Sequence, residues 1–430
     1  MGADAPDHQS SPKSDSKLGI MIVAGEASGD KHGAALARSL IELYPETSFE
    51  MFGSGGDEMR SAGVETLVDA REVAIIGVLE IILALGKFYR AYRRLLDAAR
   101  ERKPDVVVLI DWPDFNMRLA RRLHREGFKV AYYISPQVWA WRKYRVRAIR
   151  RDVDRMLVIL PFEEKFYEEA GVRVDYVGHP LAEAVHATAT RAEFCSRHDL
   201  DPDRTIISLL PGSREKEVHY HLPAQLEAVK ELRISNFEFR ISETSNSQFA
   251  IRNSQFLIPL ASTVDRAQVD GILKTAGMLD DPGVKLVEQD TYNTLFHSSF
   301  AVVASGTATV EAALAGVPMV IIYRGSELNW RLIRPLIHLD TFGMVNLIAG
   351  RRIVPELLQH DVTGERIASE VAGLLTDPNR LSLMRIDLTE VRERLRSGGG
   401  SASGRAARAV INLISPPPQT IPGKYSSSPS

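Results

Sequence analysis

Short apolar runs alternate with amphipathic stretches along most of the chain. The apolar runs predict strands at Ile20–Ala24, Val106–Ile110, Val130–Ile134, Met156–Leu160, Ile206–Leu210, Phe256–Leu260, Ala301–Ala304 and Met319–Tyr323. Helical patterns lie between them, for example at Gly33–Tyr44, Tyr89–Arg102, Met117–Arg125 and Thr309–Ala315. Nearly continuous apolar strands separated by helices are typical of parallel sheets covered on both faces. The pattern therefore predicts an α/β chain with doubly wound parallel sheets.

The strand pattern divides the chain into two Rossmann-like halves. One strand ends near 177–180, and a polar helical stretch leads from there to the strand at Ile206. The expected segments are a disordered tail at 1–17, a first domain at 18–185, a second domain at 186–383, terminal helices at 384–414 and a disordered tail at 415–430. The crevice between two such domains is the natural place for a ligand.

One segment differs in composition from its surroundings. Residues 233–258 hold a degenerate repeat rich in Asn, Ser and Phe. We interpret it as a low-complexity insertion that expands a surface loop of the second domain, because loops tolerate added length at little cost. An additional binding loop is the alternative.

Composition excludes several classes of protein. The 430 residues carry 53 Lys and Arg against 55 Asp and Glu, a net charge of −2, so no global field attracts the chain to nucleic acid. The single cysteine, Cys195, excludes an intramolecular disulfide and a multi-cysteine zinc site, and it suits a reducing compartment. No histidine and carboxylate cluster has metal-binding spacing, so neither a metal nor a cofactor is expected.

The N-terminus and the apolar runs predict a cytoplasmic location. The first residues lack the apolar core of a secretory signal. The longest apolar stretch, Val73–Gly86, is interrupted by Glu80 and is shorter than the roughly 18 residues of a spanning helix. A peripheral membrane contact remains compatible with both observations.

A glycine-containing turn follows the first strand and opens a helix. Its two glycines allow a ligand to approach the backbone, and the helix N-terminus offers unpaired N–H groups. A tight turn capped by Asp30 is the structural alternative, but Glu26 is unusual for a simple turn and favours a ligand role. The candidate residues of this turn are Gly25, Glu26, Ser28, Gly29 and Asp30.

A carboxylate follows the strand Val106–Ile110. Asp111 lies at the carboxyl end of this strand, where α/β sheets hold their ligands. A carboxylate whose pKa is raised by burial can act as a general base. The structural alternative is that Asp114 or Asn116 caps the helix that starts near Met117. We accept that role for Asp114 and interpret Asp111 as catalytic.

Two turns in the second half suit phosphate groups. Pro-Gly-Ser-Arg at 211–214 offers a hydroxyl and Arg214, whose guanidinium binds phosphate oxygens in pairs, although Ser213 could simply cap a helix. The turn Ala-Ser-Gly-Thr-Ala at 304–308 joins a strand to a helix and would place N–H groups and hydroxyls on a diphosphate. Glu311, in the following helix, could accept ribose hydroxyls. The candidate residues are Ser213, Arg214, Ser305, Gly306, Thr307, Ala308 and Glu311. No Walker lysine is present, which disfavours a P-loop NTPase.

An apolar run joins a basic helix between Val73 and Arg102. Apolar side chains beside cations fit an anionic bilayer surface or an acyl-chain substrate, and a core helix followed by a solvated one is the structural alternative. The candidate contacts are Val78, Leu79, Ile82, Leu83, Phe88, Arg93 and Arg94.

Seven motifs in order resemble the lipid-A-disaccharide synthase family. They read AGEASGD at 24–30, IDWPDFN at 110–116, SPQVWAWR at 135–142, VGHP at 177–180, LPGSR at 210–214, ASGTA at 304–308 and NLIAG at 346–350. The resemblance runs from about Gly19 to Gln359 and extends toward the C-terminal helix. The repeat at 233–258 and the two tails depart from the family.

The resemblance implies a GT-B glycosyltransferase that is peripheral on the cytoplasmic face of the bacterial inner membrane. Its donor would be UDP-2,3-diacylglucosamine and its acceptor 2,3-diacylglucosamine 1-phosphate (lipid X). The products would be a β-1,6-linked disaccharide 1-phosphate and UDP. Family members close the chain with a helix that crosses back to the first domain, and some exchange C-terminal parts in a homodimer.

The resemblance also implies roles for single residues. Asp111 would be the general base, and Glu26 with its turn would face the reacting sugars. Arg214 and the helix N-terminus after 305–307 would stabilise the departing UDP. Glu311 would hold the ribose, and Asn346 would line the donor site.

Two other functions fit the same motifs. Another GT-B enzyme that uses UDP-GlcNAc, such as a lipid-linked muramyl transferase or a UDP-GlcNAc 2-epimerase, is the first. A non-catalytic UDP-sugar-binding membrane adaptor is the second, and the Asp111 motif argues against it.

Overall fold

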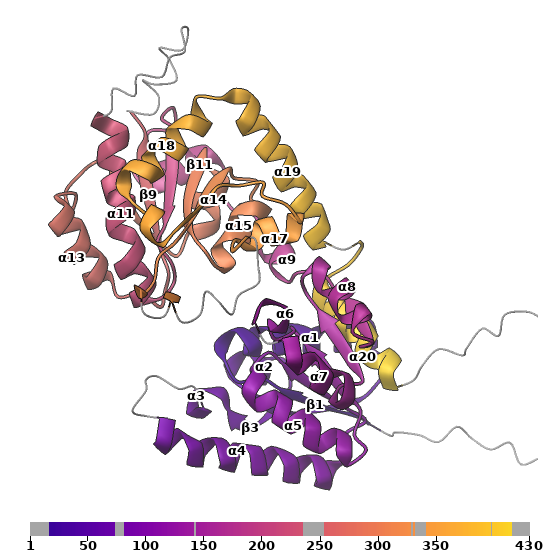
Figure 1. Ribbon diagram of the computed structural model, residues 1–430. Helices are drawn as coiled ribbons and strands as arrows, with labels where there is room; N and C mark the ends of the chain where they lie inside the picture. The colour runs from indigo at the N-terminus through magenta and orange to yellow at the C-terminus, as the bar shows by residue number, and fades with distance from the viewer. Residues whose placement is uncertain are drawn as a thin grey trace, which may run out of the picture.

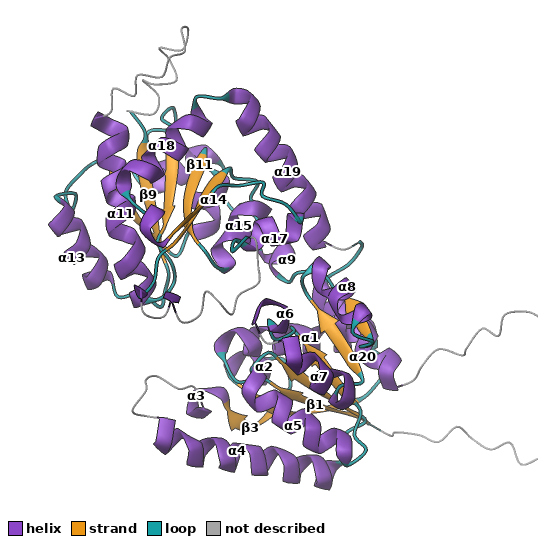
Figure 2. Ribbon diagram, viewed as in Figure 1, coloured by secondary structure: helices purple, strands orange, loops and turns teal. Residues whose placement is uncertain are grey.

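Two fully parallel sheets organise the chain (Figures 1 and 2). The structure, a computed structural model, describes residues 17–73, 81–141, 143–234, 253–327, 330–331, 341–396 and 398–414. Of the expected tail at 1–17, residues 1–16 lie outside the described residues, as does the whole of the expected tail at 415–430. The predicted α/β chain with two doubly wound parallel sheets is confirmed.

The first sheet has seven strands in the order β3-β2-β1-β4-β5-β6-β7. Its strands are β1 (Leu18–Val23), β2 (Phe49–Gly55), β3 (Glu65–Asp69), β4 (Val106–Ile110), β5 (Val130–Tyr133), β6 (Arg155–Val158) and β7 (Val174–Tyr176). The helices around it are α1 (Ala27–Leu43), α2 (Asp57–Ser61), α3 (Ala70–Val73), α4 (Ile81–Arg102), α5 (Pro113–Arg125), α6 (Val138–Trp141), α7 (Val146–Asp152) and α8 (Pro161–Glu169).

The central strands of this sheet are apolar along their whole length because both faces are covered. Successive side chains of a strand point to opposite faces. In β1, Met21 and Val23 enter one core cluster, while Ile20 and Ile22 enter the other. All four side chains are fully buried. Burial on both faces explains why continuous apolar runs in the sequence predicted β1 and β4 correctly.

The strand expected to end near 177–180 is β7. Of the described strands, the sequence pattern missed four: β2, β3, β10 and β13. Three of them are edge strands, where one neighbour is absent and polar residues are tolerated. The fourth, β2, lies inside its sheet but ends in Gly-Ser-Gly at 53–55, which weakens its strand signal.

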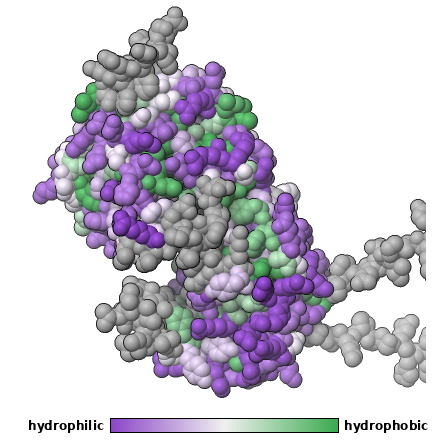
Figure 3. All heavy atoms as spheres, in the orientation of Figure 1, coloured by the Kyte–Doolittle hydropathy of each residue, from purple (hydrophilic) through white to green (hydrophobic). Residues whose placement is uncertain are grey.

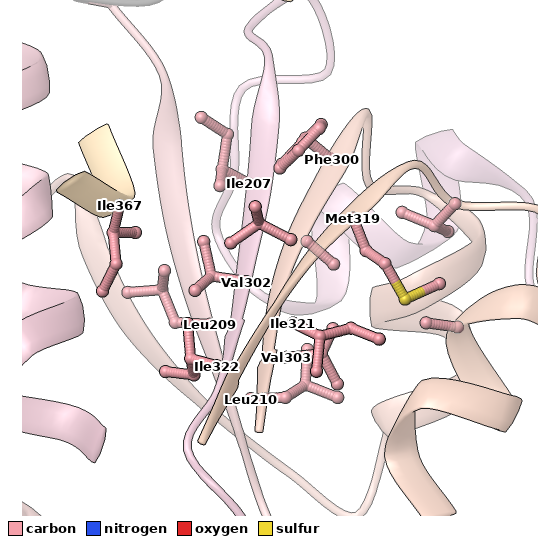
Figure 4. Packing of buried hydrophobic residues seen from close by; sticks show 14 of the residues in the cluster. Ile207, Leu209, Leu210, Phe300, Val302, Val303, Met319, Ile321, Ile322 and Ile367 are labelled. Atoms are coloured by element: carbon pink, nitrogen blue, oxygen red, sulfur yellow. The ribbon is translucent and has the colours of Figure 1, made fainter. Parts of the chain in front are cut away.

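The second sheet has six strands in the order β10-β9-β8-β11-β12-β13. They are β8 (Ile206–Leu210), β9 (Gln255–Leu260), β10 (Val284–Glu288), β11 (Phe300–Ala304), β12 (Met319–Tyr323) and β13 (Glu356–Leu358). The helices are α10 (Arg191–Arg197), α11 (Glu215–Ile234), α13 (Arg266–Ala276), α14 (Thr291–Phe296), α15 (Thr307–Leu314), α17 (Met344–Ala349) and α18 (Gly364–Leu375). Figure 4 shows Leu209, Val302 and Ile322 of adjacent strands on the face of the sheet that Ile367 of α18 covers.

Both ends of the expected insertion at 233–258 belong to regular structure. Arg233, in α11, forms an ion pair with Asp281, and its guanidinium lies 5.5 Å from the ring centre of Phe256 in β9. Residues 235–252 lie outside the described part of the chain. The predicted insertion at 233–258 therefore overlaps the end of α11 and the start of β9.

The chain passes between the two domains twice. The first passage leads from β7 to α9 (Leu181–Ala184), and the second leads from α19 (Pro378–Arg396) to α20 (Ala402–Ile414). The backbone N–H of His179 donates to the carbonyl of Leu395 (2.9 Å), and the Tyr176 hydroxyl donates to the carbonyl of Arg394 (2.6 Å). These bonds tie the two passages together.

Helix α20 returns to the first domain and packs against α1 (Figure 1). Ala406, Ala407 and Val410 are fully buried in the cluster that holds Ile20 and Ile22. The last described helix thus completes the core of the first domain. Among the described residues, no helix has the length and apolar character needed to cross a bilayer.

Candidate active site

Asp111 lies in a constrained backbone turn at the carboxyl end of β4. Asp111 and Trp112 both adopt positive φ values, 45° and 51°, which non-glycine residues rarely do. The Asp111 carbonyl accepts hydrogen bonds from Asn116 Nδ2 (2.8 Å) and the Tyr132 hydroxyl (2.6 Å). These bonds hold the turn, and strain of this kind is concentrated at functional sites.

The carboxyl group of Asp111 is half-buried and lies within electrostatic range of Glu26. Burial raises the pKa of Asp111, and the negative charge of Glu26 raises it further, while the backbone N–H of Trp112 acts in the opposite direction. Glu26 is exposed and is the N-cap residue of α1. The structure therefore brings together the two carboxylates that the sequence singled out, and a raised pKa suits a general base.

An aromatic cluster supports this turn from α4. Trp112 stacks on Phe115 with ring centres 3.9 Å apart and planes 9° from parallel. Phe88 of α4 lies 5.8 Å from Trp112 and 6.2 Å from Phe115. Gly25 lies against the ring of Trp112. The space that the missing side chain of Gly25 leaves is therefore filled by the Trp112 indole, whereas the sequence had suggested a ligand there.

Asp30, a predicted substrate contact, binds the start of α2. Its side chain is 6% exposed, and its carboxylate accepts hydrogen bonds from the backbone N–H groups of Gly56 (2.6 Å), Glu58 (3.1 Å) and Met59 (3.1 Å). These bonds cap the N-terminus of α2. Gly29 is likewise buried, and a Cβ there would lie 3.1 Å from that of Ala24.

Ser28 is the remaining predicted residue of this turn. It is exposed in the first turn of α1, two residues after Glu26. Of the five residues predicted there, Glu26 and Ser28 therefore present exposed polar side chains at the carboxyl end of the first sheet.

The turn after β8 is shaped by Glu217 of α11. Gly212 has a φ of 121°, and a Cβ at that residue would lie 2.5 Å from the Glu217 Cβ. The Glu217 carboxylate accepts from the backbone N–H of Ser213 (2.9 Å) and pairs with Arg214 (2.9 Å). Arg214 remains 81% exposed, so its guanidinium is available to an anion.

The turn after β11 presents small polar residues at the start of α15. Ser305 is half-buried, and Gly306 and Thr307 are exposed. Thr309 is buried and donates from its hydroxyl to the carbonyl of Gly306 (2.8 Å), which fixes the turn. Ala308 is half-buried behind them. The first N–H groups of α15 are the kind of donor that binds phosphate.

Glu311 lies one turn further along α15. Its side chain is half-buried, and burial raises its pKa. Within the described residues it makes no hydrogen bond or ion pair. A carboxylate of this kind can accept hydrogen bonds from a bound ligand.

A cavity of about 320 Å³ lies beside Ser305 in the second domain. Its aromatic wall comprises Tyr323, Trp330 and Phe342, whose ring centres lie 6.0 and 5.4 Å apart in that order. The remaining lining residues are Lys216, Glu217, Tyr220, His221, Arg324, Gly325, Ser326 and Gln359. The sequence analysis missed this cavity, because its aromatic residues form no motif.

Asn346, expected at the donor site, is buried behind the aromatic wall of this cavity. It is 1% exposed, and its Oδ1 accepts from the N–H groups of Ile353 (2.7 Å) and Val354 (3.0 Å). Its Nδ2 donates to the carbonyl of Val354 (3.0 Å) and to Glu356 (2.6 Å). Glu356 in turn accepts from the N–H of Phe342 (2.8 Å), a residue of the cavity wall. Asn346 therefore supports the wall from behind.

The predicted membrane-facing residues fall into three groups. Phe88 packs inward against the first-domain core, whereas Arg93 and Arg94 are exposed. Tyr89, beside them on the helix, is 62% exposed. Figure 3 shows a largely hydrophilic surface over this part of the first domain. Val78, Leu79 and the side chains of Ile82 and Leu83 lie outside the described part of the structure.

The tryptophan loop at 135–142 supplies a buried network between the domains. Trp139 is 7% exposed, and its indole N–H donates to Glu163 (3.0 Å). Burial raises the pKa of Glu163 to about 7, against the opposing effect of this bond. Trp139 and Leu160 belong to the same apolar cluster as the second-domain core. No group of histidine, cysteine and carboxylate side chains in the described ranges could hold a metal ion.

Similarity to known proteins covers nearly the whole chain. The sequence model of the family described as Lipid-A-disaccharide synthetase matches residues 20–410. A lipid-A-disaccharide synthase of Koribacter versatilis is 44% identical over 398 residues, which cover 92% of this chain and 98% of the relative. One from Geobacter sulfurreducens is 44% identical over 395 residues, which cover 92% and 97%.

Solved structures show the same architecture at low sequence identity. A putative UDP-N-acetylglucosamine 2-epimerase from Listeria monocytogenes has a TM-score of 0.56 and 14% identity, covering 93% of this chain and 96% of its own. The glycotransferase of kitacinnamycin has a TM-score of 0.58 and 16% identity, covering 92% and 99%. These likenesses show the fold, which is that of the GT-B glycosyltransferases.

Proposed function

Because the chain belongs to the lipid-A-disaccharide synthase family, and is thus a glycosyltransferase, we propose that it joins two acylated glucosamines. The proposed donor is UDP-2,3-diacylglucosamine, and the proposed acceptor is 2,3-diacylglucosamine 1-phosphate. The products are the β-1,6-linked disaccharide 1-phosphate and UDP. The observation that carries this proposal is the half-buried carboxyl of Asp111, whose pKa is raised at the carboxyl end of β4.

The proposed reaction is a single displacement that inverts the anomeric centre. The 6-hydroxyl oxygen of the acceptor forms a bond to the anomeric carbon of the donor, while the bond from that carbon to the UDP oxygen breaks. The hydroxyl proton passes to the carboxylate of Asp111. Positioned proton transfer of this kind contributes about 10²- to 10⁴-fold to a rate. Glu26 increases the basicity of Asp111 through the repulsion between the two carboxylates.

The departing UDP carries concentrated negative charge, which the second domain is suited to stabilise. The exposed Arg214 and the N–H groups at the start of α15 supply positive charge and hydrogen-bond donors. Glu311 is proposed to accept ribose hydroxyls. The aromatic-walled cavity beside Ser305 is proposed to hold the base, because aromatic side chains stack on planar rings. Asp30 and Asn346 have no part in this proposal.

The same proposal places the enzyme on the cytoplasmic face of the inner membrane. Arg93, Arg94 and Tyr89 on α4 are exposed, and cations with interfacial aromatic rings favour an anionic lipid surface. Phe88 connects this helix to the Asp111 turn through the aromatic cluster. Acyl chains that reach the site from the bilayer would therefore approach along α4.

A single assay tests the reaction. Purified protein is incubated with the diacylated UDP-sugar and the diacylated sugar 1-phosphate, and the mixture is examined by mass spectrometry. We expect the disaccharide 1-phosphate and UDP in equal amounts. Free UDP-GlcNAc is the control substrate: its epimerisation, without product from the lipid pair, would overturn the proposal in favour of an epimerase.

A further inference from the structure

His221 is a buried histidine that connects two loops of the second domain. It lies in α11 and is 1% exposed. Its Nδ1 lies 2.8 Å from the carbonyl oxygen of Pro211, in the turn after β8. Its Nε2 lies 2.9 Å from the backbone nitrogen of Arg324, directly after β12. One imidazole ring thus spans the ends of two strands that β11 separates in the sheet.

The two partners define the protonation state of the ring. A carbonyl oxygen only accepts, so Nδ1 carries the proton and donates to Pro211. A backbone N–H only donates, so Nε2 is unprotonated and accepts from Arg324. Only the neutral imidazole satisfies both bonds. Burial lowers the pKa of His221 and so favours this neutral form.

Both loops that His221 connects belong to the proposed donor site. The turn at 211–214 carries Arg214, and Arg324 lines the aromatic-walled cavity. His221 itself lies in the cavity wall, with its ring centre 6.5 Å from that of Tyr323. Gly325 follows Arg324 in the chain, and its N–H donates to the side-chain oxygen of Gln359 (3.4 Å). The loop after β12 is therefore held by Gln359 as well as by His221.

We propose that His221 is a positioning residue for the donor nucleotide, which it serves by fixing the phosphate turn at 211–214 relative to Arg324 in the cavity wall. This inference rests on the proposed function, since it takes UDP as the ligand of the cavity. His221 touches neither reacting atom. Its loss weakens donor binding and leaves the chemistry at Asp111 intact.

The experiment compares three substitutions by calorimetric titration with UDP and by steady-state kinetics on the full chain. His221→Phe keeps a ring but removes both hydrogen bonds. His221→Gln places an amide oxygen near the position of Nε2 and can restore the bond to Arg324. His221→Asn places an amide nitrogen near the position of Nδ1 and can restore the bond to Pro211. His219→Phe, at an exposed histidine of the same helix, is the matched control.

We expect His221→Phe to weaken UDP binding and raise the donor KM about tenfold, because the variant loses both hydrogen bonds that hold the two loops together. The acceptor KM and the kcat at saturating donor stay within twofold of the parent. His221→Gln or His221→Asn recovers part of the affinity. If His221→Phe does not fold, His221→Gln and His221→Asn serve as the test. Each should then show a smaller loss of UDP affinity and a smaller rise in donor KM, with acceptor KM and kcat unchanged.

Two results would overturn the inference. One is UDP binding by His221→Phe, or by both amide variants, within twofold of the parent. The other is a fall in kcat or a rise in acceptor KM as large as the change in donor KM, which marks a general structural defect. Failure of the proposed function looks different, because then the unaltered protein itself forms no disaccharide from the diacylated donor and acceptor, whatever its affinity for UDP.

Discussion

The indole of Trp112 fills the space that a side chain at residue 25 would occupy. A Cβ at Gly25 would lie 2.1 Å from the nearest ring atom of Trp112, well inside van der Waals contact. Trp112 follows Asp111 directly and shares its left-handed backbone conformation. The turn after β1 and the turn after β4 are therefore fitted to each other, and the position of Asp111 depends on both.

Gly25→Ala tests this fit. The added methyl group must displace Trp112, and with it Asp111, so we expect kcat to fall at least tenfold through misplacement of the base. The measurement is steady-state turnover together with circular dichroism. Gly271→Ala in α13 is the control, because a Cβ there meets nothing within 4 Å. Equal activities of the parent and Gly25→Ala would show that the fit is not required.

Asp111→Asn tests the proposed base. The amide keeps the shape of the side chain but cannot accept the proton, so we expect kcat to fall about 10²- to 10⁴-fold while UDP affinity is unchanged. Asp114→Asn is the matched control, since Asp114 is an exposed aspartate three residues away that pairs with Arg145. Similar turnover in Asp111→Asn and the parent would remove the base assignment.

Glu26→Gln tests the electrostatic relationship between the two carboxylates. The charge of Glu26 raises the pKa of Asp111, so removing that charge lowers it. A base must be deprotonated to act, and the acid limb of the profile of kcat/KM against pH should therefore move to lower pH. Glu42→Gln, at the exposed far end of the same helix, should leave the limb in place. An unchanged or upward-shifted limb in Glu26→Gln would contradict the relationship.

Glu163→Gln tests the buried carboxyl between the domains. Its folded-state pKa, about 7, exceeds the ordinary value of 4.5, so between these values the folded protein holds a proton that the unfolded chain releases. Raising the pH through this window therefore favours unfolding, by up to about 1.4 kcal/mol per pH unit from this group. We expect the unfolding free energy of the variant to decline less than that of the parent from pH 5 to 7.

Chemical denaturation at several pH values measures this difference. Glu168→Gln, an exposed glutamate on the same helix, serves as the control and should follow the parent. Parallel curves for Glu163→Gln and the parent would show that the carboxyl is ionised in the folded protein throughout this range.

Charge reversal on α4 tests the membrane contact. Each basic residue near an anionic surface is worth about 1 kcal/mol, so the double change of Arg93→Glu and Arg94→Glu should weaken binding to phosphatidylglycerol vesicles by tenfold or more. Co-sedimentation with the vesicles measures this binding. Arg380→Glu with Arg385→Glu reverses two exposed charges on α19 of the second domain. An equal loss in both double variants would indicate a diffuse charge effect without a defined surface.

The sequence predicted the central strands because they are buried on both faces and therefore apolar throughout. It could not predict edge strands such as β3 and β13, whose residues meet both core and solvent. Asp111 was identifiable because a carboxylate directly after a buried strand lies at the ligand-binding edge of the sheet. The electrostatic effect of Glu26 on Asp111 could not be predicted, because it depends on how close the loops after β1 and β4 lie in the folded chain.

Asp30 and Asn346 show the limit of motif reasoning. Both lie in motifs that resemble the family, yet the carboxylate of Asp30 and the side-chain oxygen of Asn346 accept hydrogen bonds from backbone N–H groups within the protein. Sequence alone does not distinguish a polar residue that supports a site from one that touches the ligand. His221 gave no signal at all, because its two partners are backbone groups, which carry no sequence signature.

The placement of α20 affects how the protein is made. Domains of a growing polypeptide generally fold in the order in which they leave the ribosome. Here Ala406, Ala407 and Val410 fill the core of the domain translated first, so that domain is finished last. A chain stopped by a premature codon after α19 would carry an intact C-terminal half and an N-terminal half with an open apolar face. Such a product would be a substrate for chaperones and proteases.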